Sequence, residues 1–426
     1  MNAVYHICQQ LECEEATAAG LYCAMERFGG SEKEAANADE NLGRWYDLQY
    51  PGLRQLLRLY LEEFLSLFQE DSSYRIYASV PCPTVLPLAF NRTGKVRVYT
   101  AEFCSMLVLH GILGQNINRL NSGDGCAHCG LLESRFQYLE QDCVPRPDLL
   151  WSFGLLCDEC PKTDERIQAL MQLEMLSTFC GHMSDEQEFK RYEKSLRDDI
   201  ETVMHRTGLH SLPSKQAWDD TRRIGLLIGE ITCRNNEAEH PPLKAASLAM
   251  IHSACLMAFR NSDALIKALT EIRRNIKADL SVRQRPIKKI YCYYIPPCVP
   301  EFGSIFERYN IRLLGDAAFL SLPVYSSFDQ DLAGYAAASW QSAVLSRDTE
   351  QNITATVAAI EKYHCDGYLT GLFSFDRWLG AGHKLSAERI EQYSGKHVYQ
   401  TDTDFWGLNF NPARIDTFAQ TLLEMV

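Results

Sequence analysis

Residues 95–160 carry the pattern that decides the fold. The stretch begins with Lys95-Val-Arg-Val-Tyr-Thr-Ala-Glu-Phe-Cys-Ser-Met106 and ends with Pro147-Asp-Leu-Leu-Trp-Ser-Phe-Gly-Leu-Leu-Cys-Asp-Glu-Cys160, with Gly125-Cys-Ala-His-Cys-Gly130 between them. The first and last segments are short apolar runs, typical of buried strands, that lead within a few residues to a cysteine. Ligands bind outside the carboxyl ends of the strands in an open α/β sheet. The pattern therefore predicts a site of the metal or iron–sulfur kind at these cysteines.

Strand-like and helix-like segments alternate on both sides of this stretch. One more strand is expected just before it, and a second alternating block opens near residue 288; the strands expected beyond the central stretch are at 75–80, 288–295, 311–315, 365–370 and 397–401. Strands that alternate with helices favour parallel sheets, so we expect an α/β protein.

The other segments have helical periodicity. Pro51 stands where a helix can begin, and the apolar residues after it recur at the spacing of one helix face. We expect an N-terminal helical segment, a first α/β domain that carries the cysteines, a helical connection and a second α/β domain, with boundaries at 1–72, 73–215, 216–285 and 286–426.

Composition narrows the class of protein. The 426 residues carry a net charge of −13, which argues against a nucleic-acid partner because phosphate binding needs clustered Lys and Arg. No apolar stretch approaches the roughly 20 residues of a membrane helix, and the N-terminus has no export-signal pattern. We therefore expect a cytoplasmic protein whose sixteen cysteines include metal ligands or redox groups. For Cys180, Cys233 and Cys255, within helical patterns, a buried apolar role is expected instead.

The C-terminal block carries the most specific likeness to a known family. Its segments Asp366-Gly-Tyr-Leu369, His397-Val-Tyr-Gln-Thr-Asp402 and Arg414-Ile-Asp-Thr-Phe418 resemble the 2-hydroxyacyl-CoA dehydratase and benzoyl-CoA reductase superfamily. Earlier pieces agree in order. Val80-Pro-Cys-Pro-Thr-Val-Leu86 is similar to an early proline-containing loop of that family, and Cys104 and Cys157 match its first two cluster cysteines.

The resemblance implies a fold, a cofactor and partners. Members of the superfamily have two flavodoxin-like parallel α/β domains with a 4Fe–4S cluster between them, held by three cysteines. An ATP-hydrolysing activator protein supplies a low-potential electron, which the dehydratases pass to an acyl-CoA substrate to expel a hydroxyl group. The resemblance thus implies an oxygen-sensitive homo- or heterodimer. This sequence has neither a Walker A nor a GxGxxG pattern, so ATP hydrolysis is expected in the partner.

Two departures from the family pattern leave alternatives open. Asp376 occupies the position of the third cysteine. Either its carboxylate binds iron, as a harder ligand than a thiolate, or the cluster in this subunit is altered or lost. Cys126 and Cys129, with Cys143, are additional, and they resemble the double-cubane-cluster reductases of the same superfamily. Together with Cys160 they allow a larger or second cluster.

A zinc site is the rival interpretation of the same residues. The pairs Cys126-x-x-Cys129 and Cys157-x-x-Cys160 have the composition of a four-cysteine zinc site. The 27 residues between the pairs exceed the usual ~15–20 of such sites, which favours iron–sulfur.

Polar residues near the cysteines are secondary candidates. Glu102 is a candidate acid–base group, although an exposed surface glutamate is the more ordinary interpretation, and Ser105 and His128 are candidates to hydrogen-bond a cluster or substrate. Asp402 and Arg414 are expected to form a structural ion pair.

The sequence as a whole predicts an iron–sulfur subunit of a radical-type 2-hydroxyacyl-CoA dehydratase, a lyase, or of a related ATP-dependent reductase. Cys104 and Cys157 are the first expected ligands, and Cys126 and Cys129 the next. A non-catalytic partner subunit with the same fold and a zinc-stabilised binding module are the alternatives.

Overall fold

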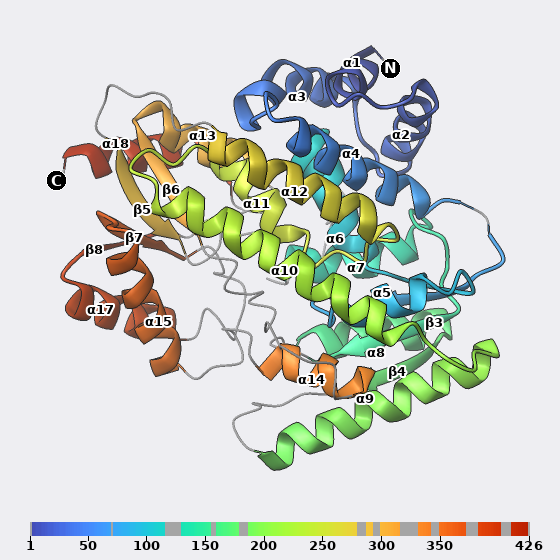
Figure 1. Ribbon diagram of the computed structural model, residues 1–426. Coiled ribbons are helices and arrows are strands. Elements are labelled where there is room, and N and C mark those ends of the chain that lie inside the picture. Colours follow the sequence, from blue (N-terminus) through green and yellow to red (C-terminus); the bar gives the residue numbers. More distant parts are fainter. Residues whose placement is uncertain are drawn as a thin grey trace.

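The computed structural model describes most of the chain. The described residues are 2–69, 71–115, 129–154, 159–178, 186–278, 287–292, 299–315, 331–341, 349–371, 382–401 and 410–424. They form helices and two parallel sheets (Figure 1), which confirms the expected α/β class. None of the helices in these ranges has the length and apolar composition needed to cross a membrane.

Both described sheets contain four strands in the same spatial order. The first is ordered β2 (Val96–Tyr99), β1 (Tyr74–Ala78), β3 (Leu149–Phe153) and β4 (Glu174–Thr178), and the second β6 (Ile311–Gly315), β5 (Lys288–Cys292), β7 (Gly367–Thr370) and β8 (His397–Gln400). All neighbouring strands are parallel. In each sheet the strand order reverses beside the first strand, and this switch point is where open α/β sheets bind ligands.

Burial explains which strands the sequence could reveal. β3, Leu-Leu-Trp-Ser-Phe, is buried at every position, as expected of a parallel strand covered on both faces. β4, Glu-Met-Leu-Ser-Thr, is an edge strand with only its last residue buried, and its mixed composition led us to expect helix there. The expectation of helix at 174–178 is wrong because an edge strand exposes much of its surface.

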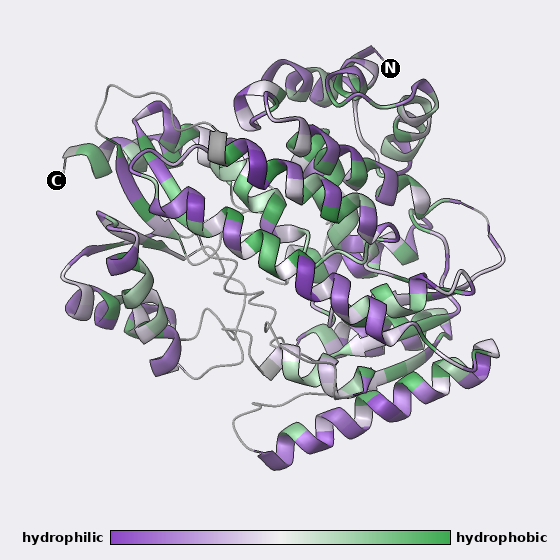
Figure 2. Cartoon of the chain, viewed as in Figure 1, coloured by the Kyte–Doolittle hydropathy of each residue, from purple (hydrophilic) through white to green (hydrophobic). Residues whose placement is uncertain are grey.

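Helices connect and cover the strands of the first sheet. They are α5 (Val85–Asn91), α6 (Ala101–Ser105), which continues as the π-helical η1 (Met106–Ile112), α7 (Gly130–Glu140), α8 (Glu159–Met171) and α9 (Glu186–Thr207). α9 buries Tyr192, Leu196, Ile200 and Val203 at helical spacing. The rest of this helix is strongly polar (Figure 2), so α9 is an amphipathic outer helix.

The N-terminal helices pack on a central helical layer. They are α1 (Asn2–Gln10), α2 (Glu15–Arg27), α3 (Glu32–Trp45) and α4 (Pro51–Ser66), and α4 begins at Pro51 and buries the expected apolar face. α4 packs on α12 (Ser262–Ala278), which in turn packs on α10 (Ser214–Glu237), and Tyr60 Oη donates to the carbonyl oxygen of Met250 in α11 (Ala245–Ser253) at 2.8 Å. The sequence of residues 222–229 is compatible with a helix or a strand, and in the structure they are helical, within α10.

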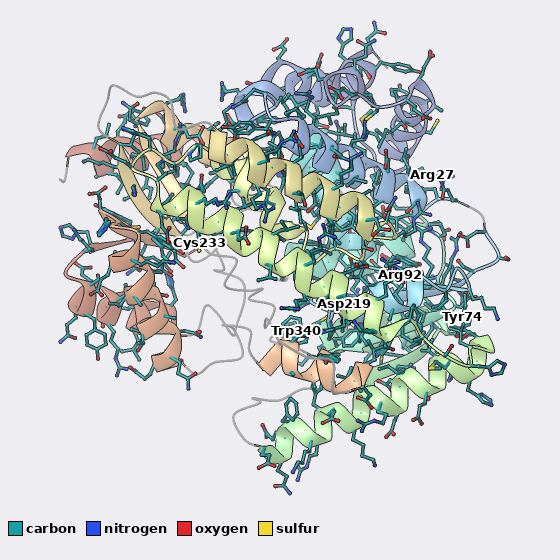
Figure 3. The ribbon with its side chains drawn as sticks, viewed as in Figure 1. Arg27, Tyr74, Arg92, Asp219, Cys233 and Trp340 are labelled. Carbon is teal, nitrogen blue, oxygen red and sulfur yellow. The ribbon has the colours of Figure 1, made fainter. Side chains whose placement is uncertain are left out.

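This helical layer is attached to both sheets. The Arg92 side chain, after α5, pairs with Asp220 of α10 and donates to Ser262 Oγ of α12 at 2.8 Å; Arg92 is labelled in Figure 3. On the other side α11 packs on α13 (Pro300–Arg308), the helix that links β5 to β6. The layer therefore connects the two α/β units.

One helix from the second half of the chain packs on the first unit. α14 (Leu332–Gln341) follows β6 in sequence, but it lies beside α9 and α5 (Figure 1). Arg197 Nε donates to Asp331 Oδ2 at 2.7 Å, and the rings of Trp218 and Tyr335 stack 3.9 Å apart. The second sheet is accompanied by the remaining helices, α15 (Thr349–Lys362), α17 (His383–Ser394) and α18 (Pro412–Glu424).

Candidate functional site

Glu102 lies at the carboxyl edge of the first sheet, inside the protein. It is the second residue of α6, which begins directly after β2 and Thr100. Its side chain is fully buried, and both carboxylate oxygens accept hydrogen bonds from Arg135 Nη1, at 3.2 and 3.3 Å. The expectation of an exposed surface glutamate is wrong, because a partner 33 residues away in α7 allows the charge to be buried.

Arg135 is the hub of this buried network. Its Nε donates to Asp164 Oδ1 of α8 at 2.6 Å, and Nη1 and Nη2 donate to the carbonyl oxygens of Ala78 and Tyr77 at 3.0 and 3.3 Å. The guanidinium carbon also lies 4.0 Å from the centre of the Tyr77 ring. One fully buried side chain therefore ties α6, α7 and α8 to the carboxyl end of β1.

The electrostatics of the network favour charged Arg135 and a weakened acid at Glu102. Burial alone lowers the pKa of an arginine, but the carboxylates of Asp164 and Glu102 hold that of Arg135 well above its usual value. Burial raises the pKa of Glu102, and the Arg135 cation opposes part of that shift. With its carboxylate turned to Arg135 and no exposed surface, Glu102 has the geometry of a structural ion pair rather than of an acid in contact with substrate.

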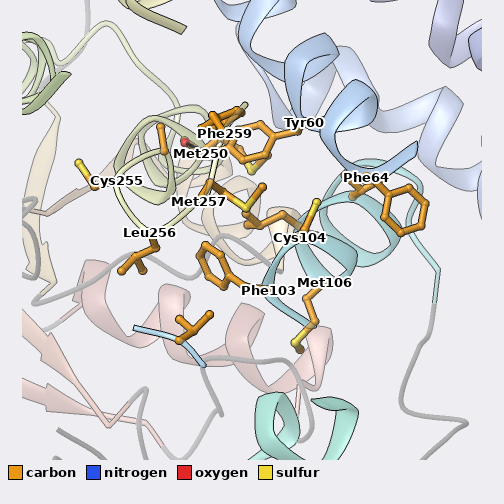
Figure 4. Packing of buried hydrophobic residues seen from close by; sticks show 14 of the residues in the cluster. Tyr60, Phe64, Phe103, Cys104, Met106, Met250, Cys255, Leu256, Met257 and Phe259 are labelled. Carbon is orange, nitrogen blue, oxygen red and sulfur yellow. Dashed lines mark hydrogen bonds between the residues drawn. The ribbon is translucent and has the colours of Figure 1, made fainter. Parts of the chain in front are cut away.

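Cys104 lies on a different side of α6 from Glu102. The two residues are two positions apart, and a helix turns about 100° per residue, so their side chains diverge by roughly 200°. Cys104 is buried in the same apolar cluster as Tyr60, Phe64 and Met257 (Figure 4). Burial raises the pKa of its thiol well above the ordinary value. In this setting Cys104 packs as a small apolar side chain.

The other described candidate cysteines occupy separate positions. Cys129 is half-buried at the N-cap of α7, and Cys160 is buried in the first turn of α8, with Sγ 4.0 Å from Asp164 Oδ2. Cys143 follows α7 and donates from Sγ to the carbonyl oxygen of Arg27 at 3.4 Å, which fastens this turn to the N-terminal helices.

The described part of the chain does not assemble a metal site. No group of three or more His, Cys, Asp or Glu side chains within it is placed to hold a metal ion, so Cys104, Cys129 and Cys160 do not form one together. The other expected ligands, Cys126, Cys157 and Asp376, lie outside the described residues, as does His128.

Ser105 and Arg414 complete the predicted set. The Ser105 hydroxyl is buried and has no hydrogen-bond partner among the described residues. Arg414 is exposed on α18, while Asp402, its expected ion-pair partner, lies outside the described residues.

Two residues of this region were missed in the sequence. Cys82, between Pro81 and Pro83 after β1, is buried, and burial together with the nearby Glu102 raises its pKa to about 12, against the effect of Arg135. The signal for Cys82 was present, since it follows a strand just as Cys104 does. Arg135 gives no local signal, because it sits within an ordinary helical segment.

The three cysteines expected to be apolar differ in outcome. Cys255 is buried, and burial raises its pKa to about 12, which confirms the expectation. Cys233, labelled on α10 in Figure 3, is only half-buried and accepts a hydrogen bond from Lys362 Nζ at 3.7 Å. The expectation of a buried apolar role is therefore wrong for Cys233. Cys180 lies outside the described residues.

Comparisons with known proteins add no family assignment. The sequence matches no protein-family model, and no curated protein matches it. The structure itself defines the class: an α/β protein with two equally ordered parallel sheets and a buried ion network at the carboxyl edge of the first.

Proposed function

We propose that the chain is an iron–sulfur subunit of the 2-hydroxyacyl-CoA dehydratase and benzoyl-CoA reductase superfamily. It receives low-potential electrons from an ATP-hydrolysing activator and uses them to dehydrate a 2-hydroxyacyl-CoA, or to reduce another small substrate as the double-cubane-type reductases do. The order of the four described strands in each sheet agrees with the first four strands of the flavodoxin-like order, which supports the two-domain architecture implied by the resemblance.

The observation that carries the proposal is the link between the ion network and the cysteines. Glu102 shares α6 with Cys104, Arg135 shares α7 with its N-cap Cys129, and Asp164 shares α8 with Cys160. One guanidinium thus fixes the three helices that carry candidate ligands, at the edge where α/β sheets bind ligands. A cluster site needs such fixed supports, because hydrogen bonding and burial around the ligands tune the metal.

The described residues do not by themselves fit a cluster. Iron–sulfur clusters are bound by converging thiolates, and Cys104, Cys129 and Cys160 do not converge. In this proposal Cys126 and Cys157 supply further thiolates. The chemistry that the cluster supplies when bound is one-electron transfer at low potential; the described residues of this chain hold the carboxyl edge in place.

Anaerobic purification followed by iron and sulfide analysis tests the proposal. The wild-type chain is expected to contain both, Cys126→Ala to lose or change the cluster, and Cys233→Ala to keep it, because Cys233 lies on α10 beside Lys362. An iron-free wild-type chain would overturn the proposal, whereas an unchanged cluster in Cys126→Ala would remove only the extra cysteines from the site. One zinc per chain without visible absorbance would instead support the zinc-stabilised module.

A non-catalytic partner subunit is the second candidate. Asp376 in place of the third family cysteine favours it, and so does Cys104, whose thiol lies among apolar side chains. This candidate predicts that the chain is purified without iron but forms a heterodimer with a second, iron-containing subunit. Native mass spectrometry of the anaerobic complex distinguishes the two.

A further inference from the structure

The turn after α1 brings two cysteines together. The N–H of Cys13 donates to the carbonyl oxygen of Cys8 at 2.8 Å, and the N–H of Glu12 donates to that of Gln9 at 3.1 Å. Glu12 has a left-handed backbone conformation, with φ of 59°. These features define a Schellman motif, in which the side chains corresponding to Cys8 and Cys13 are normally an apolar contact pair. Here the contact pair consists of two thiols.

The two thiols differ in exposure. Cys8 lies on the buried face of α1, whereas Cys13 is partly exposed. A small molecule in solution therefore reaches Cys13 first. Arg58 of α4 is fixed beside Cys13, because its Nη1 donates to the carbonyl oxygen of Glu12 at 3.0 Å.

The acidity of the pair follows the same asymmetry. A hydrogen bond between the two side chains lowers the pKa of Cys13; burial and Glu62 oppose that shift, and the Arg58 cation adds to it. The same hydrogen bond and burial raise the pKa of Cys8. The accessible sulfur is thus the better thiolate and the buried one is held as a thiol beside it, an arrangement suited to a nucleophile and a resolving cysteine.

We propose that Cys8 and Cys13 form a redox-active dithiol that is oxidised by low-molecular-weight disulfides. The Cys13 thiolate attacks one sulfur of the small disulfide, so that a mixed disulfide forms and one small thiolate leaves. Cys8 then gives up its proton and attacks the Cys13 sulfur, and the second small thiolate leaves. Two protein thiols lose two electrons in total, and the small disulfide is reduced to two thiols.

Exposure distinguishes this pair from another neighbouring pair of cysteines. Cys292 and Cys365 lie near one another at the second sheet, but both are buried. Only a pair with an accessible member can start thiol–disulfide exchange, because the incoming sulfur must reach a thiolate. The dithiol is also independent of the proposed cluster, since it belongs to the N-terminal helices.

Oxidised glutathione applied to the full-length chain tests the proposal. The protein is incubated over a range of ratios of oxidised to reduced glutathione, alkylated and analysed by peptide mass spectrometry with fragmentation. In the wild type we expect a Cys8–Cys13 disulfide, with loss of the free thiols of both residues. The exposed Cys23 of α2 is the matched control, so Cys23→Ser should retain the link.

Single-cysteine variants separate the two roles. Cys8→Ser is expected to stop at a glutathione adduct on Cys13, because no resolving thiol remains. Cys13→Ser is expected to leave Cys8 unmodified, since Cys8 is buried. A wild-type chain that keeps both thiols, or that stops at the adduct on Cys13, would overturn the proposal. That measurement needs no variant and does not depend on the presence of iron.

Discussion

Replacing Arg135 with methionine tests the ion network most severely. Arg135→Met keeps much of the side-chain volume but leaves the carboxylates of Glu102 and Asp164 buried without their cation. The carbonyl oxygens of Tyr77 and Ala78 also lose a donor. Breaking a buried ion pair by removing one partner costs roughly 3–5 kcal/mol. We therefore expect the free energy of unfolding to fall by about 4 kcal/mol, and most of this loss comes from the broken ion pairs of Arg135.

Urea unfolding followed by circular dichroism measures this loss, and Arg166→Met is the matched control. Arg166 is exposed on α8, and its guanidinium lies 3.8 Å from the centre of the Phe136 ring. Losing an exposed cation–π contact costs about 0.5–1 kcal/mol. A fall in Arg135→Met no larger than in the control would refute the structural role of the network.

The dependence of this loss on pH separates charge from packing. Burial raises the pKa of Glu102 and Arg135 opposes the shift, so removal of Arg135 raises that pKa further. The folded variant then binds this proton more tightly than the unfolded chain, and its stability relative to wild type falls as pH rises from about 5 to about 8. Adding Glu102→Gln and Asp164→Asn should recover part of the loss at the higher pH. A loss that is the same at both pH values would indicate a packing defect.

Two other features give quantitative predictions. In Gly52→Ala the new Cβ would lie 2.7 Å from the carbonyl oxygen of Ala268 and 2.6 Å from the backbone nitrogen of Ile272 in α12. Urea unfolding should therefore show that the free energy of unfolding falls by about 1–3 kcal/mol. Gly43→Ala, where the Cβ meets nothing, should instead gain up to about 1 kcal/mol, and equal effects at the two sites would contradict the close approach of α4 and α12. Burial raises the pKa of Glu307 to about 7, so ionisation of this group should cost the wild type up to roughly 3 kcal/mol of stability as pH rises from about 4 to about 7, and Glu307→Gln should lack that part of the pH dependence. The same pH dependence in Glu307→Gln and wild type would show that another group titrates.

The strands were predictable wherever their sequence is locally decisive. β3 is apolar at every position except Ser152, and α4 has both a proline start and a continuous apolar face. The edge strand β4 escaped prediction, because partial exposure leaves it without either an apolar run or a clear alternation. The packing of α14 on the first unit also has no local signal, since it depends on contacts between distant segments, such as that of Arg197 with Asp331.

The candidate site was predictable in position but not in its contacts. Cysteines that follow strands indicated the carboxyl edge, and Cys104 and Cys160 do lie on the helices that begin there. The burial of Glu102 could not be seen in the sequence, because its partner Arg135 comes from a separate helix and has no distinguishing neighbours. The thiol pair was hidden for a different reason: Schellman turns usually show a glycine or asparagine in the left-handed position, and here that residue is Glu12.

The iron and acid-labile sulfide content of the anaerobically purified wild-type chain tests the central claim most directly. The proposed iron–sulfur subunit should contain both, and it should show a broad visible absorbance that is bleached on reduction. A folded chain that contains neither iron nor sulfide, and acquires neither on anaerobic reconstitution with iron and sulfide, would contradict the assignment.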